Sequence, residues 1–173
     1  MYQNKLLTYS LRFVVLVLLQ VLVINQMDGS DYLMPVVYPI FILLLAPTMP
    51  KISVLVLAFA IGFSVDICSN TLGLHMSASL LMAFARPYAL SWITLRGGDV
   101  IQKVGIYRVG FRKFLIYAGI LIFIHQFYFY ILDAFHFMNF SRLFLKILLN
   151  TVVSVGLIFL TLVIFESKKQ SRR

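Results

Sequence analysis

Long apolar stretches follow one another along nearly the whole chain, and only short polar turns separate them. A helix needs about 20 mostly apolar residues to cross the hydrocarbon core of a bilayer. Hydrophobic residues make up 61% of the 173 residues and charged residues 12%, whereas a soluble domain has roughly 45–50% and 25%. A core of this size cannot bury so much apolar surface, so lipid is the expected solvent. The sequence therefore predicts an all-α integral membrane protein.

Six stretches have the length and composition of membrane-spanning helices. They cover residues 7–25, 33–49, 52–68, 72–95, 114–137 and 143–165. The second contains Pro35, Pro39 and Pro47, so we expect kinks or a partly re-entrant path there. Together the six stretches use about 120 residues, which leaves no loop long enough for a soluble domain. We expect residues 1–173 to form a single six-helix transmembrane domain.

The distribution of basic residues predicts the orientation, because Lys and Arg are enriched on the cytoplasmic side. With the N-terminus in the cytoplasm, the cytoplasmic side receives Lys5, Arg12, Lys51, Arg96, Lys103, Arg108, Arg112, Lys113, Lys168, Lys169, Arg172 and Arg173. The opposite side receives only Arg142 and Lys146, together with Asp28, Asp31, Asp66 and Asp133. We therefore expect a multi-pass membrane protein with both termini in the cytoplasm and residues 26–32 and 138–141 outside.

Several functional classes find no support in the sequence. The net charge of +9 comes from short basic runs between apolar stretches, which is typical of topology signals and not of nucleic-acid binding. Anionic lipid headgroups are the expected partners of the basic loop 96–113 and of the tail 166–173. Cys68 is the only cysteine, and no metal-binding spacing, phosphate-binding loop or catalytic carboxylate pair occurs. We expect no cofactor, no metal and no enzymatic activity.

Asp66 interrupts the apolar run "IGFSVDICSNTLGLH" and follows Gly62 by one helical turn. A carboxylate at this position can bond backbone N–H groups at the start of the next helix, near Thr71, where the helix dipole favours it. Gly73 and the Ser-Asn-Thr triplet fit the tight turn that this requires. Two alternatives remain open: a relay for protons or cations, and a carboxylate that simply lies in interfacial water.

Small residues open the fourth predicted helix, and they allow helices to approach closely in lipid. These are Gly73, Ser77, Ala78, Ser79 and Ala83. Internal packing and a partner interface are both open interpretations of this pattern. Arg86, before Pro87 in the same helix, is expected to snorkel to the interface or to form an internal hydrogen bond, with ligand binding as the alternative.

The stretch "IHQFYFYILDAFHF" combines aromatic residues with two polar side chains, His125 and Gln126. A buried His-Gln pair must find hydrogen-bond partners, so we expect interhelical bonds, with a partner or ligand contact as the alternative. A catalytic pair of His125 with Asp133 is not expected, because eight residues along a helix separate them by about 12 Å.

The chain resembles the bacterial rod shape-determining MreD family. The resemblance rests on the six predicted spans, Gln20 in the first, the proline-containing "PVVYPIFILLLAP", the "GFSVD…TLGLH" turn and the "IHQFYFYILDAF" segment. Membership would imply a helical bundle similar to the S-components of energy-coupling-factor transporters. It would also imply a place in a bacterial cytoplasmic (inner) membrane and a role in the cell-elongation machinery with an MreC-like single-span periplasmic scaffold as partner. Links to the RodA–PBP2 peptidoglycan synthase and to MreB would be indirect.

Two functions from different classes follow. The first is a non-enzymatic scaffold of the Rod machinery that binds partner helices and helps to organise peptidoglycan synthesis. We expect its partner surface around Pro35 and Pro39 and along residues 73–83. The second is an S-component-like subunit that binds or transports a small molecule, which needs an outward polar pocket. Asp66 and His75 are among the few polar groups near the outward side, so the scaffold is favoured.

Overall fold

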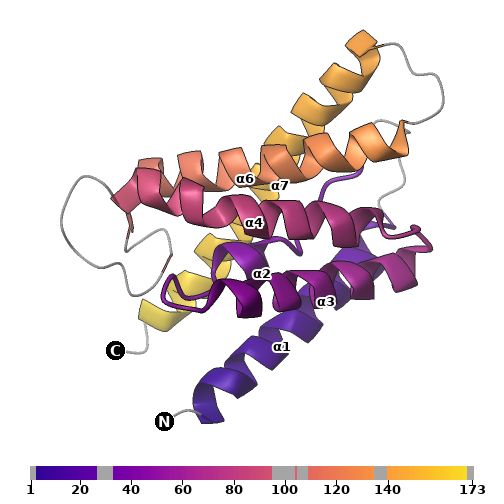
Figure 1. Cartoon of the computed structure of the whole chain (residues 1–173). Helices are drawn as coiled ribbons and strands as arrows, with labels where there is room; N and C mark the ends of the chain where they lie inside the picture. The colour runs from indigo at the N-terminus through magenta and orange to yellow at the C-terminus, as the bar shows by residue number, and fades with distance from the viewer. Residues whose placement is uncertain (1–2, 27–32, 95–103, 105–108, 135–139, 171–173) are drawn as a thin grey trace.

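The computed structural model describes residues 3–26, 33–94, 104, 109–134 and 140–170, and every regular element in them is helical (Figure 1). Side chains are described throughout these ranges except for residues 3–6, 94 and 164–170. The elements are α1 (Gln3–Leu19), the π-helix η1 (Gln20–Ile24), α2 (Ile40–Leu43), α3 (Lys51–Ser69), α4 (Leu74–Thr94), α6 (Phe111–Asp133) and α7 (Phe140–Gln170). Most of the basic loop 96–113, the tail 171–173 and the predicted outward residues 27–32 and 138–139 lie outside the described residues.

Four of the helices are long and apolar enough to cross a membrane. They span Leu7–Ile24, Lys51–Ser69, Phe111–Asp133 and Phe140–Val163. The helix α4 is 21 residues long but less apolar, because it carries His75, three serines and Arg86. The chain is thus an all-helical protein with the features of a multi-pass membrane protein.

Helices α3, α4 and α6 lie side by side, and α1 and α7 cross them obliquely (Figure 1). The closest packing joins α3 to α4, α4 to α6 and α6 to α7, whereas α1 makes only sparse contacts with α3 and α2. The start of α1 and the end of α7 lie toward the same side of the molecule (Figure 1). The turn between α3 and α4, the end of α6 and the start of α7 lie toward the other side.

The predicted second helix, residues 33–49, is wrong. Only Ile40–Leu43 is α-helical, and residues 33–37 are extended. The physical reason is that Pro35 and Pro39 cannot donate backbone hydrogen bonds, and each disfavours the helical conformation in the residue before it. The kinks that the prolines predict are present, because the chain is extended over residues 33–37, helical only over Ile40–Leu43 and irregular again over residues 44–50.

This irregular segment forms the centre of the fold. All of residues 35–43 are buried, and Tyr38, Ile42 and Leu43 are 0% exposed. They belong to the main hydrophobic cluster, with side chains such as Ile61 of α3, Met82 of α4 and Leu121 of α6. An extended backbone can lie at membrane depth only where protein surrounds it and satisfies its polar groups. The helices of the bundle therefore surround this segment and bury it.

Candidate functional site

Gln20 holds one side of the extended segment. Its Oε1 accepts hydrogen bonds from the backbone N–H groups of Val37 (2.7 Å) and Tyr38 (3.4 Å), and its Nε2 donates to the carbonyl of Pro35 (3.2 Å) and to Asn25 Oδ1 (2.8 Å). Gln20 is 1% exposed and is the first residue of the π-helix. An amide with both donor and acceptor atoms can replace the hydrogen bonds that the prolines remove. Gln20 thus holds in place an extended stretch of backbone that is part of no helix.

Two polar residues of α7 hold the other side. Asn150 Oδ1 accepts from the backbone N–H of Met34 (2.6 Å), and Ser154 Oγ accepts from that of Val36 (2.9 Å). Both side chains are fully buried and one helical turn apart. Ser154 Oγ also receives a hydrogen bond from Gln126 Nε2 on α6 (3.2 Å). Side-chain hydrogen bonds from η1 and α7 therefore hold the segment on both sides.

Tyr38 joins three elements through its hydroxyl. This hydroxyl lies 2.6 Å from His125 Nε2 on α6 and 2.9 Å from Ser79 Oγ on α4. It also lies 3.4 Å from Nδ1 and 3.3 Å from the carbonyl of His75 on α4. The two imidazole rings flank the tyrosine, with ring centroids 6.4 Å apart. The hydrogen bonding predicted for His125 is present, but its partner is Tyr38 of the irregular segment and not a residue of another helix.

Arg86 and Tyr117 secure the far end of the segment. Arg86 Nε donates to the Tyr117 hydroxyl (3.1 Å), and its Nη2 donates to the carbonyl of Leu45. The Tyr117 hydroxyl donates to the carbonyl of Leu43 (3.1 Å). Arg86 is 3% exposed, so it does not snorkel, and the internal bond that was the other half of the prediction is what forms. The guanidinium and the Tyr117 hydroxyl each satisfy one carbonyl that the broken helix leaves open.

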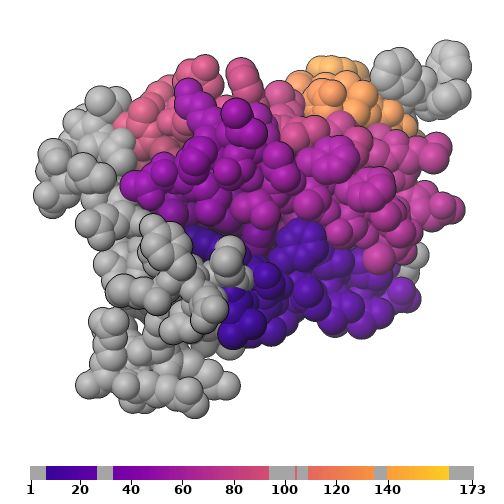
Figure 2. Space-filling model, turned by 60° about the horizontal axis from the view of Figure 1, so that its bottom comes forward, coloured from indigo at the N-terminus to yellow at the C-terminus, as the bar shows by residue number. Residues whose placement is uncertain are grey.

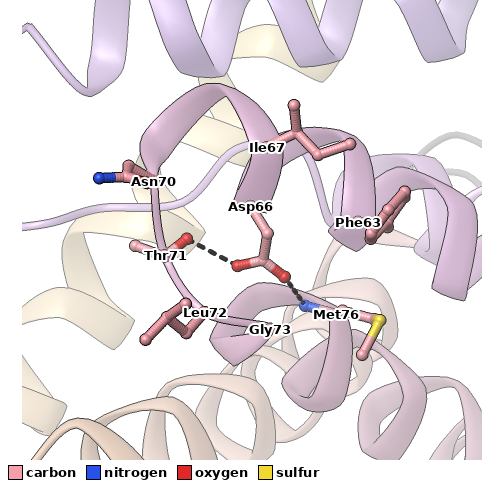
Figure 3. A pocket seen from close by; sticks show the side chains of 8 residues that line it. All are labelled: Phe63, Asp66, Ile67, Asn70, Thr71, Leu72, Gly73 and Met76. Carbon is pink, nitrogen blue, oxygen red and sulfur yellow. Dashed lines mark hydrogen bonds between the residues drawn. The ribbon is translucent and has the colours of Figure 1, made fainter.

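Asp66 bonds the start of α4 from the end of α3 (Figure 3). Its Oδ1 accepts from the Thr71 hydroxyl (2.6 Å) and the His75 N–H (3.0 Å), and its Oδ2 accepts from the Met76 N–H (2.8 Å). The side chain is 5% exposed. The predicted capping of the next helix is confirmed, and the carboxylate compensates for its burial by charge-assisted bonds at the positive end of α4.

Two glycines allow this arrangement. A Cβ on Gly62 would lie 2.6 Å from Met76 Cα and 2.7 Å from the His75 carbonyl oxygen, so only glycine lets α3 approach the backbone of α4 this closely. Gly73 has a φ of +82°, which L-residues rarely adopt. A shallow hollow of about 240 Å³ lies over this turn between Phe63, Leu72 and Met76 (Figure 3). The polar atoms of Asp66 at its floor are already bonded within the turn.

Much of the predicted partner surface is buried. Pro35 and Pro39 are buried, as are Ala78, Ser79 and Ala83 in the small-residue stretch. Ser77 is partly exposed and its hydroxyl bonds the carbonyl of Leu74 (3.0 Å). The small residues of α4 pack internally because the irregular segment and α6 lie against them. Of the two open interpretations of these residues, internal packing is the one that the structure supports.

Among the described residues, three buried side-chain polar atoms have no hydrogen-bond partner, and all of them lie on α6. They are His125 Nδ1, Gln126 Oε1 and the Tyr130 hydroxyl oxygen. When the Tyr38 hydroxyl donates to His125 Nε2, the neutral imidazole carries its proton on Nδ1. The predicted interhelical bond of Gln126 is present, but it uses only the Nε2 atom. A partner or ligand contact therefore remains open for these atoms.

The described residues contain no group of three or more His, Cys, Asp or Glu side chains that could hold a metal ion. His75 and His125 meet around the Tyr38 hydroxyl, and this hydroxyl occupies the space between their nearest nitrogen atoms. Cys68 is exposed and free. The arrangement is suited to holding backbone in place.

Sequence reasoning missed several of the side chains that form this network. Tyr38, Tyr117, Asn150 and Ser154 were not predicted to take part in it. Asn150 and Ser154 gave a signal, because they are polar, one turn apart and inside an apolar span. The tyrosines gave none, since buried and interfacial tyrosines look alike in sequence.

No protein-family model, no curated protein and no solved structure matches this chain.

Proposed function

We propose that this chain is a non-enzymatic membrane scaffold of the MreD type, whose bundle is similar to energy-coupling-factor S-components. In this proposal the irregular segment 33–50 and α4 complete six crossings, and both termini face the cytoplasm of a bacterial inner membrane. The partner is an MreC-like single-span periplasmic scaffold. The links to the RodA–PBP2 synthase and to MreB are indirect.

The buried segment 35–43 is the observation that carries the proposal. A small-molecule binding subunit needs an outward pocket with convergent polar groups. Here the chain itself occupies the middle of the bundle, and its polar partners, such as Gln20, Tyr38 and Arg86, are bonded to backbone and to each other. The carboxylate of Asp66 is likewise bonded within its own turn. These features favour a rigid body that presents surfaces to other proteins.

The helix α1 is the best candidate for the partner surface. Only 17% of its spanning window is buried, against 33% or more for α3, α6 and α7. Leu7, Leu11, Val14, Leu18 and Leu22 form an exposed stripe at helical spacing. Figure 2 shows α1, in indigo, on the outside of the bundle. A single partner helix laid along this stripe would give α1 the packing that its own bundle does not provide.

Co-purification tests whether the protein is a scaffold and whether α1 carries the partner surface. The tagged protein, extracted from native membranes in mild detergent, is expected to retain a stoichiometric single-span protein with a large periplasmic domain. Leu11→Trp and Leu18→Trp should reduce its recovery by disturbing the α1 stripe. The matched control Val56→Trp, on the exposed face of α3, should not. If the protein purifies alone and holds a small molecule tightly, the scaffold proposal is wrong and the S-component-like function replaces it.

A further inference from the structure

Helix α4 exposes a line of aromatic side chains along one face. Phe84, Tyr88 and Trp92 follow one another at intervals of four residues, and they are 61%, 64% and 71% exposed. The ring centroids of Phe84 and Tyr88 lie 6.2 Å apart. Since α4 lies between α3 and α6 and packs closely against both (Figure 1), this aromatic line faces away from the bundle.

The size of these side chains disfavours a partner helix as their neighbour. Helices pair in lipid through small residues that let their backbones approach each other. The small residues of α4, such as Ala78, Ser79 and Ala83, point inward and are buried. The outward face carries bulky rings instead, which hold a second helix at a distance. Lipid is therefore the expected neighbour of the aromatic line.

The chemistry of the three aromatic side chains changes in order along the helix. Phe84, at the midpoint of α4 (Leu74–Thr94), has no polar side-chain atom. Tyr88 adds a hydroxyl, and Trp92, close to the end of the helix, adds an indole N–H. Among the described residues neither of these polar groups has a hydrogen-bond partner. Tyrosine and tryptophan are enriched where the hydrocarbon of a bilayer meets the headgroups, because one end of each side chain is apolar and the other polar.

The lengths of the helices place Trp92 near such a boundary. From Leu74 to Trp92 α4 rises about 27 Å, and α3, with 19 residues, is about 28 Å long. On α6, the exposed residues Lys113 and Asp133 are about 30 Å apart along the axis. The hydrocarbon core of a bilayer is about 30 Å thick. The end of α4 lies on the same side of the molecule as the starts of α3 and α6 (Figure 1), where Lys51 and Lys113 are exposed.

The polar side chains of α4 do not prevent this helix from crossing the hydrocarbon. His75, Ser79 and Arg86 are buried. They form hydrogen bonds with the Tyr38 hydroxyl or the carbonyl of Leu45, both in the irregular segment. These residues lower the mean hydropathy of α4, yet none of them faces lipid.

We propose that Tyr88 and Trp92 bind the lipid headgroup region on the Lys51 side of the bilayer, and that α4 crosses the whole hydrocarbon core. The indole N–H and the phenol hydroxyl donate to ester and phosphate oxygens of phospholipids, and Phe84 lies among acyl chains. Lys51 and Lys113 lie at the same surface and attract its anionic lipids. This inference is independent of the scaffold function, because it uses no part of the α1 surface.

Tryptophan fluorescence tests the depth of Trp92, which is the only tryptophan in the chain. The full-length protein is reconstituted into phosphatidylcholine vesicles whose acyl chains carry bromine, a contact quencher, either close to the ester groups or close to the terminal methyl groups. Bromine close to the ester groups is expected to quench Trp92 about twofold more strongly than the deeper bromine.

A matched variant moves the fluorophore along the same face of α4. Trp92→Phe combined with Phe84→Trp places the only tryptophan about 12 Å further along the axis, at an exposed position at the midpoint of the helix. The deeper bromine should then quench more strongly. Circular dichroism and Tm show whether the variant keeps the fold, and the measurement on the parent protein needs no substitution.

Three results would overturn the proposal. Stronger quenching of Trp92 by the deeper bromine would place the end of α4 in the hydrocarbon. Quenching by aqueous acrylamide and by neither lipid would place it in water beyond the headgroups. Protection from all three quenchers would show that protein covers the aromatic line, either a partner helix or a second copy of this chain. None of these results changes what co-purification reports about the α1 surface.

Discussion

At the scale of single residues, a few polar side chains in this chain take over hydrogen bonds that regular secondary structure would otherwise make. Asp66 bonds two backbone N–H groups of α4 across a turn, and Gln20 bonds two N–H groups of the extended segment. Each side chain is buried and each bond spans different elements. A substitution at either position should therefore weaken the contact between two elements more than it weakens the helix that carries the residue.

Asp66→Leu should destabilise the protein by about 2–4 kcal/mol, because it removes a helix cap and leaves buried N–H donors unpaired. Asp66→Asn keeps one acceptor oxygen and should cost about 1 kcal/mol. Thermal unfolding in detergent measures both, with Asp133→Leu as a control that removes an exposed carboxylate. Equal tolerance of both Asp66 variants would show that the carboxylate is unimportant to the turn. Normal stability with complete loss of function in the Asn variant would indicate a relay.

At the scale of elements, the irregular segment 33–50 depends on its neighbours, and the long helices do not. A helix satisfies its own backbone, whereas residues 33–39 use Gln20, Asn150 and Ser154 for theirs. The π-helix η1 begins at Gln20 itself, and such irregularities often mark functional or structurally constrained positions. The stability of the segment is therefore set by side chains more than 100 residues apart in sequence.

Gln20→Met should loosen this segment while leaving the helices intact. The substitution keeps the approximate volume but leaves the Val37 N–H buried without an acceptor, which costs about 1–3 kcal/mol. Hydrogen exchange followed by mass spectrometry should show faster exchange in residues 33–39, with little change in α3 and α6. Leu22→Met, at an exposed position of the same π-helix, is the control. Unchanged protection of residues 33–39 in the Gln20 variant would show that Gln20 does not hold this segment in place.

At the scale of the whole molecule, each end of the bundle has an exposed turn residue that can report which side of the membrane it faces. Thr48 lies in the turn before α3, on the side from which α3 starts, and Leu72 lies in the turn after it. Both are exposed, Leu72 completely. The side that carries Lys51 and the basic residues is expected to be cytoplasmic.

Cysteine labelling of intact spheroplasts tests this orientation. In a Cys68→Ser background, which removes the exposed native thiol, Leu72→Cys should react with an impermeant thiol reagent. Thr48→Cys should react only after the membrane is permeabilised. The opposite pattern would reverse the assignment of both termini and of the side on which Lys146 lies.

The amino-acid sequence alone predicted that lipid surrounds the protein, that the fold is helical, and roughly where α1, α3, α4, α6 and α7 begin and end. These features follow from long apolar stretches, because helix formation is local and apolar side chains favour transfer into lipid. It also predicted the capping by Asp66, since that contact is nearly local. The tertiary structure decided the path of residues 33–50, the internal role of Arg86 and the burial of Pro35, Pro39 and the small residues of α4. These depend on which distant side chain meets which unpaired backbone group. That pairing is a property of the packed bundle, and no local pattern encodes it.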